Sequence, residues 1–286
     1  MVRVAWNNRK MAKFLSLFAK PFPIIGMIHV RALPGTPLHK DSMDRIIGAV
    51  RDEANIYREC GVDGVLVENM HDIPYMRPSD GVGPEITAAM TRVALAVRET
   101  VPDVPCGVQI LAGCNREALA VAKACQLQFI RAEGFVFGHM ADEGFTDACA
   151  GPLLRYRKQI EADDVLVITD IKKKHSSHAI TADVSIAETA HAADFFLSDG
   201  LIVTGSSTGC SAERVDLQAL HGKTTLPLIV GSGLTLDNLH NYWTLAHAAI
   251  VGSHFKINGH WNADLCRKRV QAFMDGVETL RRQQPS

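Results

Sequence analysis

The sequence lacks an excess of charge of either sign, and it lacks long apolar runs. Its 30 Lys and Arg residues nearly balance its 31 Asp and Glu residues, so the formal net charge is −1 over 286 residues. Without a basic field, nucleic acid is not an expected partner. No apolar run reaches the roughly 18 residues of a membrane-spanning helix, so we expect no transmembrane segment.

Cysteine pairs and short cofactor motifs are missing as well. The seven cysteines are scattered and include no C-x-x-C pair, which argues against a zinc ribbon or a disulfide framework. This cysteine usage indicates a reducing intracellular compartment. No G-x-G-x-x-G follows the first expected strand, and no H-E-x-x-H occurs. The sequence therefore requires no cofactor, and a divalent metal ion is left open.

The sequence does contain a repeated alternation of strands and helices. Apolar segments typical of strands occupy residues 24–30, 64–70, 106–112, 129–135, 165–171 and 201–205, and two more end at glycines 231 and 252. The expected helices begin at residues 41–42, at Pro84, at Asn115, at Pro152 and after Asp183, and others cover 214–220, 234–247 and 262–282. Eight such units predict an α/β fold, a parallel eight-stranded (β/α)₈ TIM barrel. A Rossmann-like open sheet is the alternative, but its glycine fingerprint is missing.

The first twenty residues form a basic extension, and residues 21–286 form a single barrel domain. Arg3, Arg9, Lys10, Lys13 and Lys20 occur with no acid before Asp41. Such a segment resembles a mitochondrial presequence. The alternative, which we favour, is a short helix that closes the bottom of the barrel with Trp6, Phe14 and Phe18 packed inward. The expected location is accordingly the cytoplasm, with the mitochondrion as the alternative.

Glycine–serine turns follow the last three strands. They are Gly205-Ser206, Gly231-Ser232-Gly233 and Gly252-Ser253. Glycine lets backbone N–H groups approach a ligand closely, and the N-terminus of a following helix favours an anion. Such turns late in a (β/α)₈ chain predict a phosphate site. The alternative is that parallel strands simply need glycine to turn into helices.

Polar residues interrupt strands that are otherwise apolar. Since the C-terminal strand ends of a barrel build its active site, we expect catalytic roles for four of them and substrate contacts for three others. The candidate catalytic residues are Glu133, Asp170, Glu68 and His29, and the candidate substrate-binding residues in or beside the strands are Arg131, Asn69 and Gln109. Carboxylates in different environments can supply a general acid and a general base. A purely structural polar network that fills the barrel is the alternative.

A run of three lysines follows the fifth strand. Lys172, Lys174 and His175 are candidate substrate contacts, for a phosphate or a carboxylate, although such a run is more often a solvated loop. A Schiff-base lysine is less favoured, because no strand interior carries a lysine whose pKa burial would lower.

Several strings together resemble the BtpA family. They are IIGMIHVRALPGTP, GVLVENMHDIPY, GVGPEITAAMTRVA, GVQILAGCN, FIRAEGFVFGHMADEG, DIKKKHSSH, VTGSSTG and PLIVGSGLTLDNL, and they extend in order from about residue 24 to residue 273. The resemblance implies a (β/α)₈ barrel of the phosphate-binding type. It also implies a link to the biogenesis of photosystem I, with which the founding member is associated as a peripheral membrane protein.

Two functions therefore compete. The first is an enzyme that acts on a small phosphorylated metabolite, a sugar phosphate or a nucleotide-derived compound, through isomerase, epimerase or lyase chemistry. The second is a non-catalytic assembly factor for membrane protein complexes. A small phosphorylated molecule is the expected partner of the first, and we expect a homo-oligomer in either case.

Overall fold

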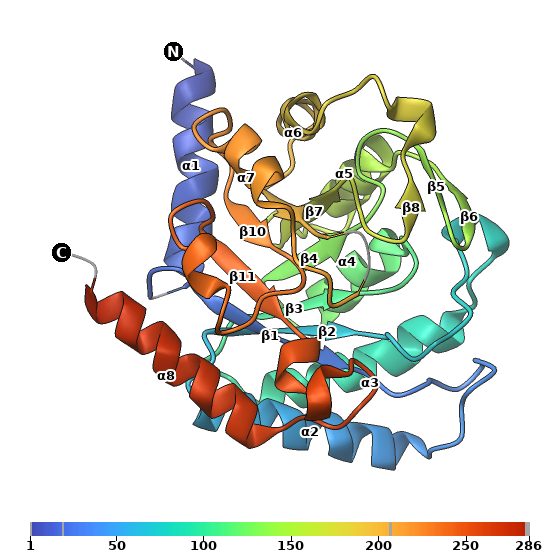
Figure 1. Ribbon diagram of the computed structural model, residues 1–286. Helices are drawn as coiled ribbons and strands as arrows, with labels where there is room; N and C mark the ends of the chain where they lie inside the picture. Colours follow the sequence, from blue (N-terminus) through green and yellow to red (C-terminus); the bar gives the residue numbers. More distant parts are fainter. Residues whose placement is uncertain (1, 19, 206–207, 284–286) are drawn as a thin grey trace.

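A closed barrel of eight parallel strands forms the centre of the molecule (Figure 1). The computed structural model describes residues 2–18, 20–205 and 208–283. The strands are hydrogen-bonded in the order β1-β11-β10-β9-β7-β4-β3-β2. Their bounds are Ile24–His29 (β1), Gly64–Glu68 (β2), Cys106–Gln109 (β3), Phe129–Ala132 (β4), Leu166–Ile171 (β7), Gly200–Val203 (β9), Leu228–Val230 (β10) and Ala248–Val251 (β11). The predicted (β/α)₈ barrel is confirmed.

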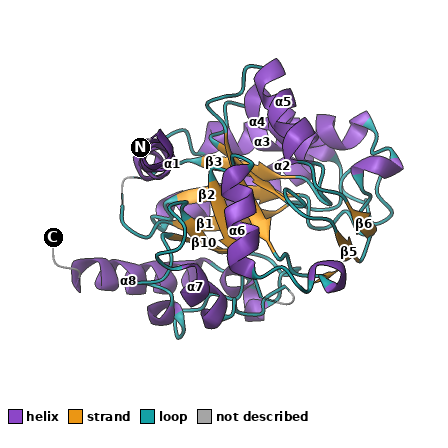
Figure 2. Ribbon diagram, turned by 90° about the horizontal axis from the view of Figure 1, so that it is seen from above, coloured by secondary structure: helices purple, strands orange, loops and turns teal. Residues whose placement is uncertain are grey.

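Helices surround the strands on the outside of the barrel (Figure 2). They are α1 (Val2–Leu17), α2 (Met43–Glu59), α3 (Pro84–Thr100), α4 (Asn115–Ala124), α5 (Ala150–Gln159), α6 (Ile186–Phe195), α7 (Arg214–Leu220) and α8 (Arg267–Gln283). The start of α2 illustrates the local cause: the Ser42 side chain accepts from the Arg45 N–H and caps the helix. The buried residues of α2 recur every three or four positions, as the apolar stripe predicts.

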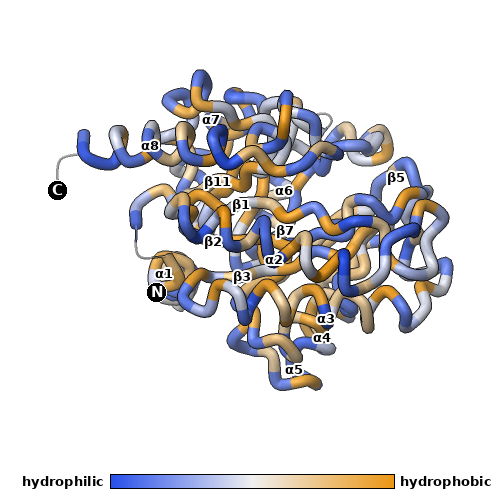
Figure 3. Tube along the Cα trace, turned by 90° about the horizontal axis from the view of Figure 1, so that it is seen from below, coloured by the Kyte–Doolittle hydropathy of each residue, from blue (hydrophilic) through white to orange (hydrophobic). Residues whose placement is uncertain are grey.

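The core has two layers, one outside and one inside the barrel. The residues of each strand contribute to the two layers in turn, because successive side chains of a strand point to opposite faces. The interior layer contains Ile25, Leu66 and Phe129, and it also contains Phe14 and Phe18 from the N-terminal segment. Both of these phenylalanines are buried, as expected. The expectation for Trp6 falls on a side chain outside the described part of the chain. At the other terminus, the free end of α8 is hydrophilic (Figure 3).

Three of the expected helices were wrong in extent or kind. Residues 234–247 contain only a short 3₁₀ turn, Leu239–Asn241. Thr235 and Asn238 exchange the side chain–backbone hydrogen bonds that start a helix, but the turn ends at Tyr242. The last helix begins at Arg267, because Ile257 donates its N–H to the Asp264 carbonyl and holds the preceding residues in a loop. Ser185, with Glu188 in a capping box, starts α6 in place of Asp183.

A small antiparallel sheet lies outside the barrel. It is formed by β5 (His139–Ala141), β6 (Gly144–Thr146) and β8 (Ser176–Ser177). Asp142 and Glu143 occupy the turn between β5 and β6, and both line the cavity described below. The sheet therefore forms one wall of the barrel mouth.

Candidate active site at the barrel mouth

Two adjoining hollows open at the C-terminal ends of the strands. The main cavity has a volume of about 500 Å³. Glu68, Gln109 and Arg131 from three neighbouring strands lie along it, and so does Glu133, which directly follows β4. The second hollow, here called the glycine cup, has a volume of about 30 Å³ and is lined by the residues that follow β10 and β11, namely Gly231, Ser232, Gly233, Gly252 and Ser253. Glu68, Met70, Arg131, Lys174 and Thr208 line both hollows, so the two form one site.

Arg131 and Asp170 form a bidentate ion pair inside the barrel. The Arg131 Nε and Nη2 atoms donate to the two Asp170 carboxylate oxygens, each at 2.8 Å. Both side chains are almost fully buried. Because this geometry uses both oxygens, Asp170 orients Arg131, and only Arg131 lines the two hollows.

Glu133 is held from two sides. Its Oε1 lies 3.4 Å from the Lys173 Nζ, and its Oε2 accepts from the Gly113 N–H at 3.1 Å. Lys173 also lies 3.3 Å from Glu143 on the β5–β6 turn. Burial alone would lower the pKa of Lys173, but Glu133 and Glu143 raise it above its ordinary value, so this lysine is charged.

Glu68 and His29 meet at the ends of β2 and β1. The His29 Nε2 lies 3.7 Å from the Glu68 Oε2, and the His29 Nδ1 lies 3.0 Å from the Trp261 carbonyl oxygen. Burial raises the pKa of Glu68, an effect that Arg131 and Lys174 only partly offset. Burial, together with Lys256, lowers the pKa of His29 to about 3. His29 is therefore neutral, and its Nδ1 carries the hydrogen that faces the carbonyl.

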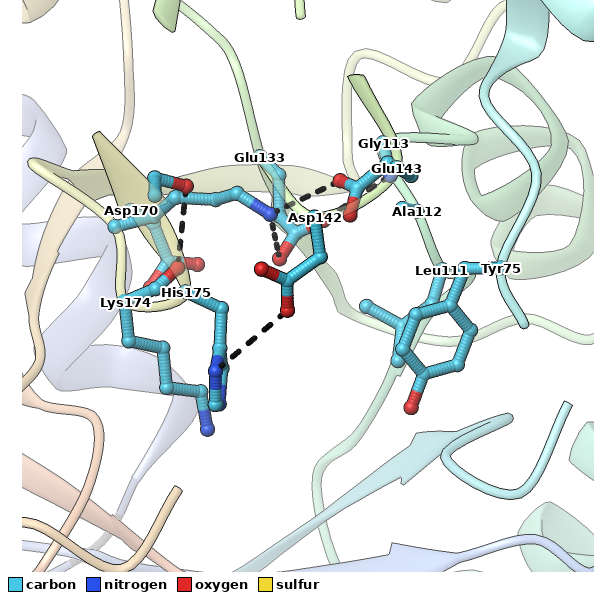
Figure 4. A network of polar contacts seen from close by, with 12 residues as sticks. Tyr75, Leu111, Ala112, Gly113, Glu133, Asp142, Glu143, Asp170, Lys174 and His175 are labelled. Atoms are coloured by element: carbon cyan, nitrogen blue, oxygen red, sulfur yellow. Dashed lines mark hydrogen bonds and ion pairs between the residues drawn. The ribbon is translucent and has the colours of Figure 1, made fainter. Parts of the chain in front are cut away.

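Lys174 and His175 close one side of the mouth. The Lys174 Nζ donates to the Thr208 Oγ1 at 3.3 Å, and the His175 Nε2 lies 2.9 Å from the same oxygen. Burial lowers the pKa of Lys174, and so does the nearby Arg131. Burial therefore does lower the pKa of a lysine here, although this lysine lies just beyond a strand and not inside one. Figure 4 shows Lys174 and His175 on one side of the opening and Tyr75 with Leu111 on the other.

Internal hydrogen bonds shape the glycine cup. The Ser232 hydroxyl accepts from the Gly205 N–H and donates to the Cys210 carbonyl, both at 2.9 Å. Gly233 has a φ of +67°, and a Cβ there would lie 2.2 Å from the Ser211 nitrogen, so only glycine fits. No long helix follows β10, so the favourable helix N-terminus expected beside this turn is absent from the described segment 234–247.

Some expected site residues lie elsewhere. The Asn69 amide donates to Asp72 and accepts from the Leu111 N–H, so it braces two loops. The Lys172 Nζ donates to the Thr181 carbonyl, and this lysine lines a separate small cavity with Asp170. The Gly205 N–H donates to the Ser232 hydroxyl and not to the hollow. Ser206 lies outside the described residues.

Sequence reasoning missed three residues that complete the site. Lys173 is 8% exposed, although a lysine run normally signals a solvated loop. Glu143 reaches it from an unexpected hairpin, and Trp261 lies directly before residue 262, where the last helix was expected to begin. The only usable signal was the position of the lysine run directly after a strand. Among the residues that the structure describes, no group of three or more His, Cys, Asp or Glu side chains could hold a metal ion.

Comparisons with known proteins agree with this architecture. Residues 20–279 match the sequence model of the BtpA family. A Caenorhabditis elegans protein whose name carries the word mitochondrial is 49% identical over 266 residues, which cover 91% of this chain and 94% of the relative. The photosystem I biogenesis protein BtpA of Synechocystis is 30% identical over 265 residues, 92% of this chain and 91% of the relative.

A solved structure shares the fold alone. Phosphoribosyl anthranilate isomerase from Thermus thermophilus superposes with a TM-score of 0.56 at 15% identity, covering 91% of this chain and all of that one (100%). Within the described part of this chain, no helix combines the length and the apolar character needed to cross a membrane.

Proposed function

The chain belongs to the BtpA family, and from its site we propose that it is an enzyme acting on a small phosphorylated metabolite. One observation carries this proposal: the glycine cup and the buried acid Glu68 line the same opening. The reaction class that fits is proton transfer, as in an isomerase, an epimerase or a lyase, because acids and a neutral histidine surround the opening. The name of the Thermus isomerase, which specifies a phosphoribosyl compound, supports the same class of substrate.

The phosphate binds in the glycine cup. The backbone of Gly233, Gly252 and Ser253 approaches the ligand without obstruction from large side chains, and small-residue turns of this kind bind anions. Lys174 and Arg131 add positive charge at the border with the main cavity. The anion is therefore attracted to the place where the two hollows meet.

Glu68 exchanges the proton. Because burial raises its pKa, this carboxyl is a better general base or acid near neutral pH than an exposed glutamate. Glu133, held by Lys173 and the Gly113 N–H, is the second carboxylate on the cavity wall. Asp170 positions Arg131, and the neutral His29, with its hydrogen on Nδ1, offers its Nε2 as a hydrogen-bond acceptor.

Binding of inorganic phosphate and ribose 5-phosphate tests the cup. A ligand at 100 times its Kd adds about 2.7 kcal/mol to the free energy of unfolding, which a thermal-shift measurement detects. We expect Lys174→Met to weaken ribose 5-phosphate binding about tenfold or more, since a partly buried cation is lost. The exposed Lys223 serves as the matched control, and Lys223→Met should leave binding unchanged. Equal binding by both variants would remove Lys174 from the site.

The second candidate function is assembly of membrane protein complexes. Its support is the name of the Synechocystis relative, which describes biogenesis of photosystem I. A complementation experiment separates the two functions. An enzyme requires the carboxylates, so a variant with Glu68→Gln and Glu133→Gln should fail to rescue a deletion strain, whereas an assembly factor would tolerate the change.

For the location, the comparison favours the mitochondrion over the cytoplasm that we first expected. The basic N-terminal segment and the name of the nematode relative both support it. A fluorescent protein fused to the C-terminus should co-localise with a mitochondrial marker. A diffuse cytosolic signal would support the original expectation.

A further inference from the structure

We propose that the substrate is a phosphate ester that carries a planar nitrogen heterocycle, in the manner of a nucleoside monophosphate, and not a simple sugar phosphate. This inference rests on the proposed function, because it takes the glycine cup as the phosphate site. It is carried by the wall of the main cavity that lies away from the cup, which the acid–base chemistry does not use.

This wall is apolar and partly aromatic. It is formed by Met70, Ile73, Tyr75, Leu111, Ala112 and Trp261, all of which line the main cavity. Of these residues, only Met70 also lines the cup. A sugar phosphate offers hydroxyl groups, which this wall cannot bind, whereas a flat ring buries its faces against aromatic and aliphatic side chains.

Contacts within the protein restrain the two aromatic residues. The Tyr75 hydroxyl donates to the Met70 carbonyl at 2.7 Å, which restrains the outer end of its ring. The Trp261 ring lies with its centroid 5.0 Å from that of His71, and its carbonyl oxygen is engaged by His29. A preformed aromatic surface costs little entropy when a ring stacks on it.

Gln109 lies beside this wall. It is 2% exposed and lines the main cavity, but its Oε1 is shielded from solvent and has no hydrogen-bond partner among the described residues. A turn of this amide toward the cavity would let the oxygen accept from an N–H group of a ligand and remove the cost of leaving it unpaired. An apolar wall beside such an amide suits a heterocycle, which stacks through its faces and hydrogen-bonds through its edge.

The size of the cavity agrees with such a ligand. The main cavity, of about 500 Å³, falls in the range of sites that hold drug-sized molecules. A phosphate in the cup would leave this space for the rest of the molecule, and a three- to five-carbon sugar alone would leave much of it empty.

Calorimetric titration with a set of related ligands tests the inference. The set contains inorganic phosphate, ribose 5-phosphate and the 5′-monophosphates of adenosine, guanosine, cytidine and uridine. Stacking of one base on an aromatic side chain corresponds to about 5- to 150-fold in affinity. We expect at least one nucleotide to bind tighter than ribose 5-phosphate by a factor in that range.

Variants of Tyr75 test whether the apolar wall causes the tighter binding of the nucleotide. Tyr75→Ala should remove most of the advantage of the nucleotide and leave the affinity for ribose 5-phosphate within about twofold of its original value. Tyr75→Phe keeps the ring and should keep most of the advantage. If ribose 5-phosphate binds and none of the four nucleotides binds more tightly, this inference is overturned while the proposed function stands. If neither phosphate, ribose 5-phosphate nor any nucleotide binds, both are overturned.

Discussion

Individual charges at the barrel mouth are balanced in different ways, and each way has a consequence for stability. Arg131 and Asp170 neutralise each other through two hydrogen bonds of 2.8 Å. Glu68 has no bidentate partner among the charged groups near it, and burial raises its pKa. We therefore expect Arg131 and Asp170 to stabilise the fold as a pair, and an ionised Glu68 to destabilise it.

Removal of the Asp170 carboxylate should leave the buried Arg131 guanidinium without its ion-pair partner. We expect Asp170→Asn to lower the free energy of unfolding by about 3–5 kcal/mol, as for other broken buried pairs. Replacing both partners, with Arg131→Met and Asp170→Leu, should recover most of this loss. Urea unfolding measures both effects. As a control, Asp163→Asn breaks an exposed ion pair with Lys158 and should change stability little. Equal losses in the single and double variants would contradict the pair as the cause.

The raised pKa of Glu68 makes a prediction about pH. In the folded protein its proton is lost at a higher pH than the ordinary carboxyl value of 4.5, so the stability this group contributes declines as the pH rises through the raised pKa. Glu68→Gln mimics the protonated form and should raise the melting temperature at pH 7 to 8. Each pKa unit corresponds to about 1.4 kcal/mol, and each kcal/mol to about 2–4 °C in a chain of this size.

This gain should shrink toward pH 4, where the glutamate is protonated in both states. Melting curves of the original protein and the variant across this range provide the measurement. A variant that is less stable than the original at pH 8 would show that Arg131 and Lys174 outweigh the burial of the charge.

At the scale of elements, the barrel is closed differently at its two ends. At the end opposite the site, Phe14 of the N-terminal helix α1 (Val2–Leu17) packs into the interior layer. Phe18, which follows the helix, packs there as well. The ring centroids of Phe14 and Phe18 lie 5.2 Å apart, and those of Phe18 and Phe129 of β4 lie 6.5 Å apart. At the mouth, by contrast, polar residues and the β5–β6 turn surround an open cavity. Packing is thus concentrated at one end and chemistry at the other.

The contribution of the N-terminal segment can be measured with two neighbouring residues. Phe14 is fully buried, and Leu15 is 52% exposed. Phe14→Ala should lower the free energy of unfolding by about 3–5 kcal/mol because it opens a cavity in the barrel interior. Leu15→Ala should change it by less than about 0.5 kcal/mol. If both variants unfold at the same denaturant concentration, the segment does not stabilise the barrel.

At the scale of the whole molecule, one surface stands out by its apolar character. Phe195, Phe196 and Leu197, at the end of α6, are 66%, 47% and 46% exposed. Large exposed apolar side chains in sequence are typical of contact surfaces. They therefore support the homo-oligomer that we expected for a barrel of this kind.

Light scattering tests this expectation. The original protein should have a mass at least twice that of the single chain of 31.2 kDa. A variant with Phe195→Ser and Phe196→Ser should shift toward the single-chain mass if this surface forms the interface. A monomer at micromolar concentration in the original protein would contradict the expected oligomer.

The sequence alone determined the barrel and the end of it that carries the polar residues. Period-two and period-3.6 patterns are local, so strands such as 24–30 and the stripe of α2 are predictable from neighbours in the chain. The same holds for the placement of Glu68, Arg131 and Glu133, because parallel strand ends meet at one rim.

Only the tertiary structure decided which of these residues form the site. Asp170 pairs with Arg131, Asn69 braces loops, Lys173 is buried by Glu133 and Glu143, and Trp261 reaches the cavity from a distant loop. These roles depend on contacts between residues far apart in sequence, and on loops such as the one before α8, which is held by the hydrogen bond from the Ile257 N–H to the Asp264 carbonyl. Burial and pairing are properties of the folded neighbourhood, and no local pattern of residue types contains them.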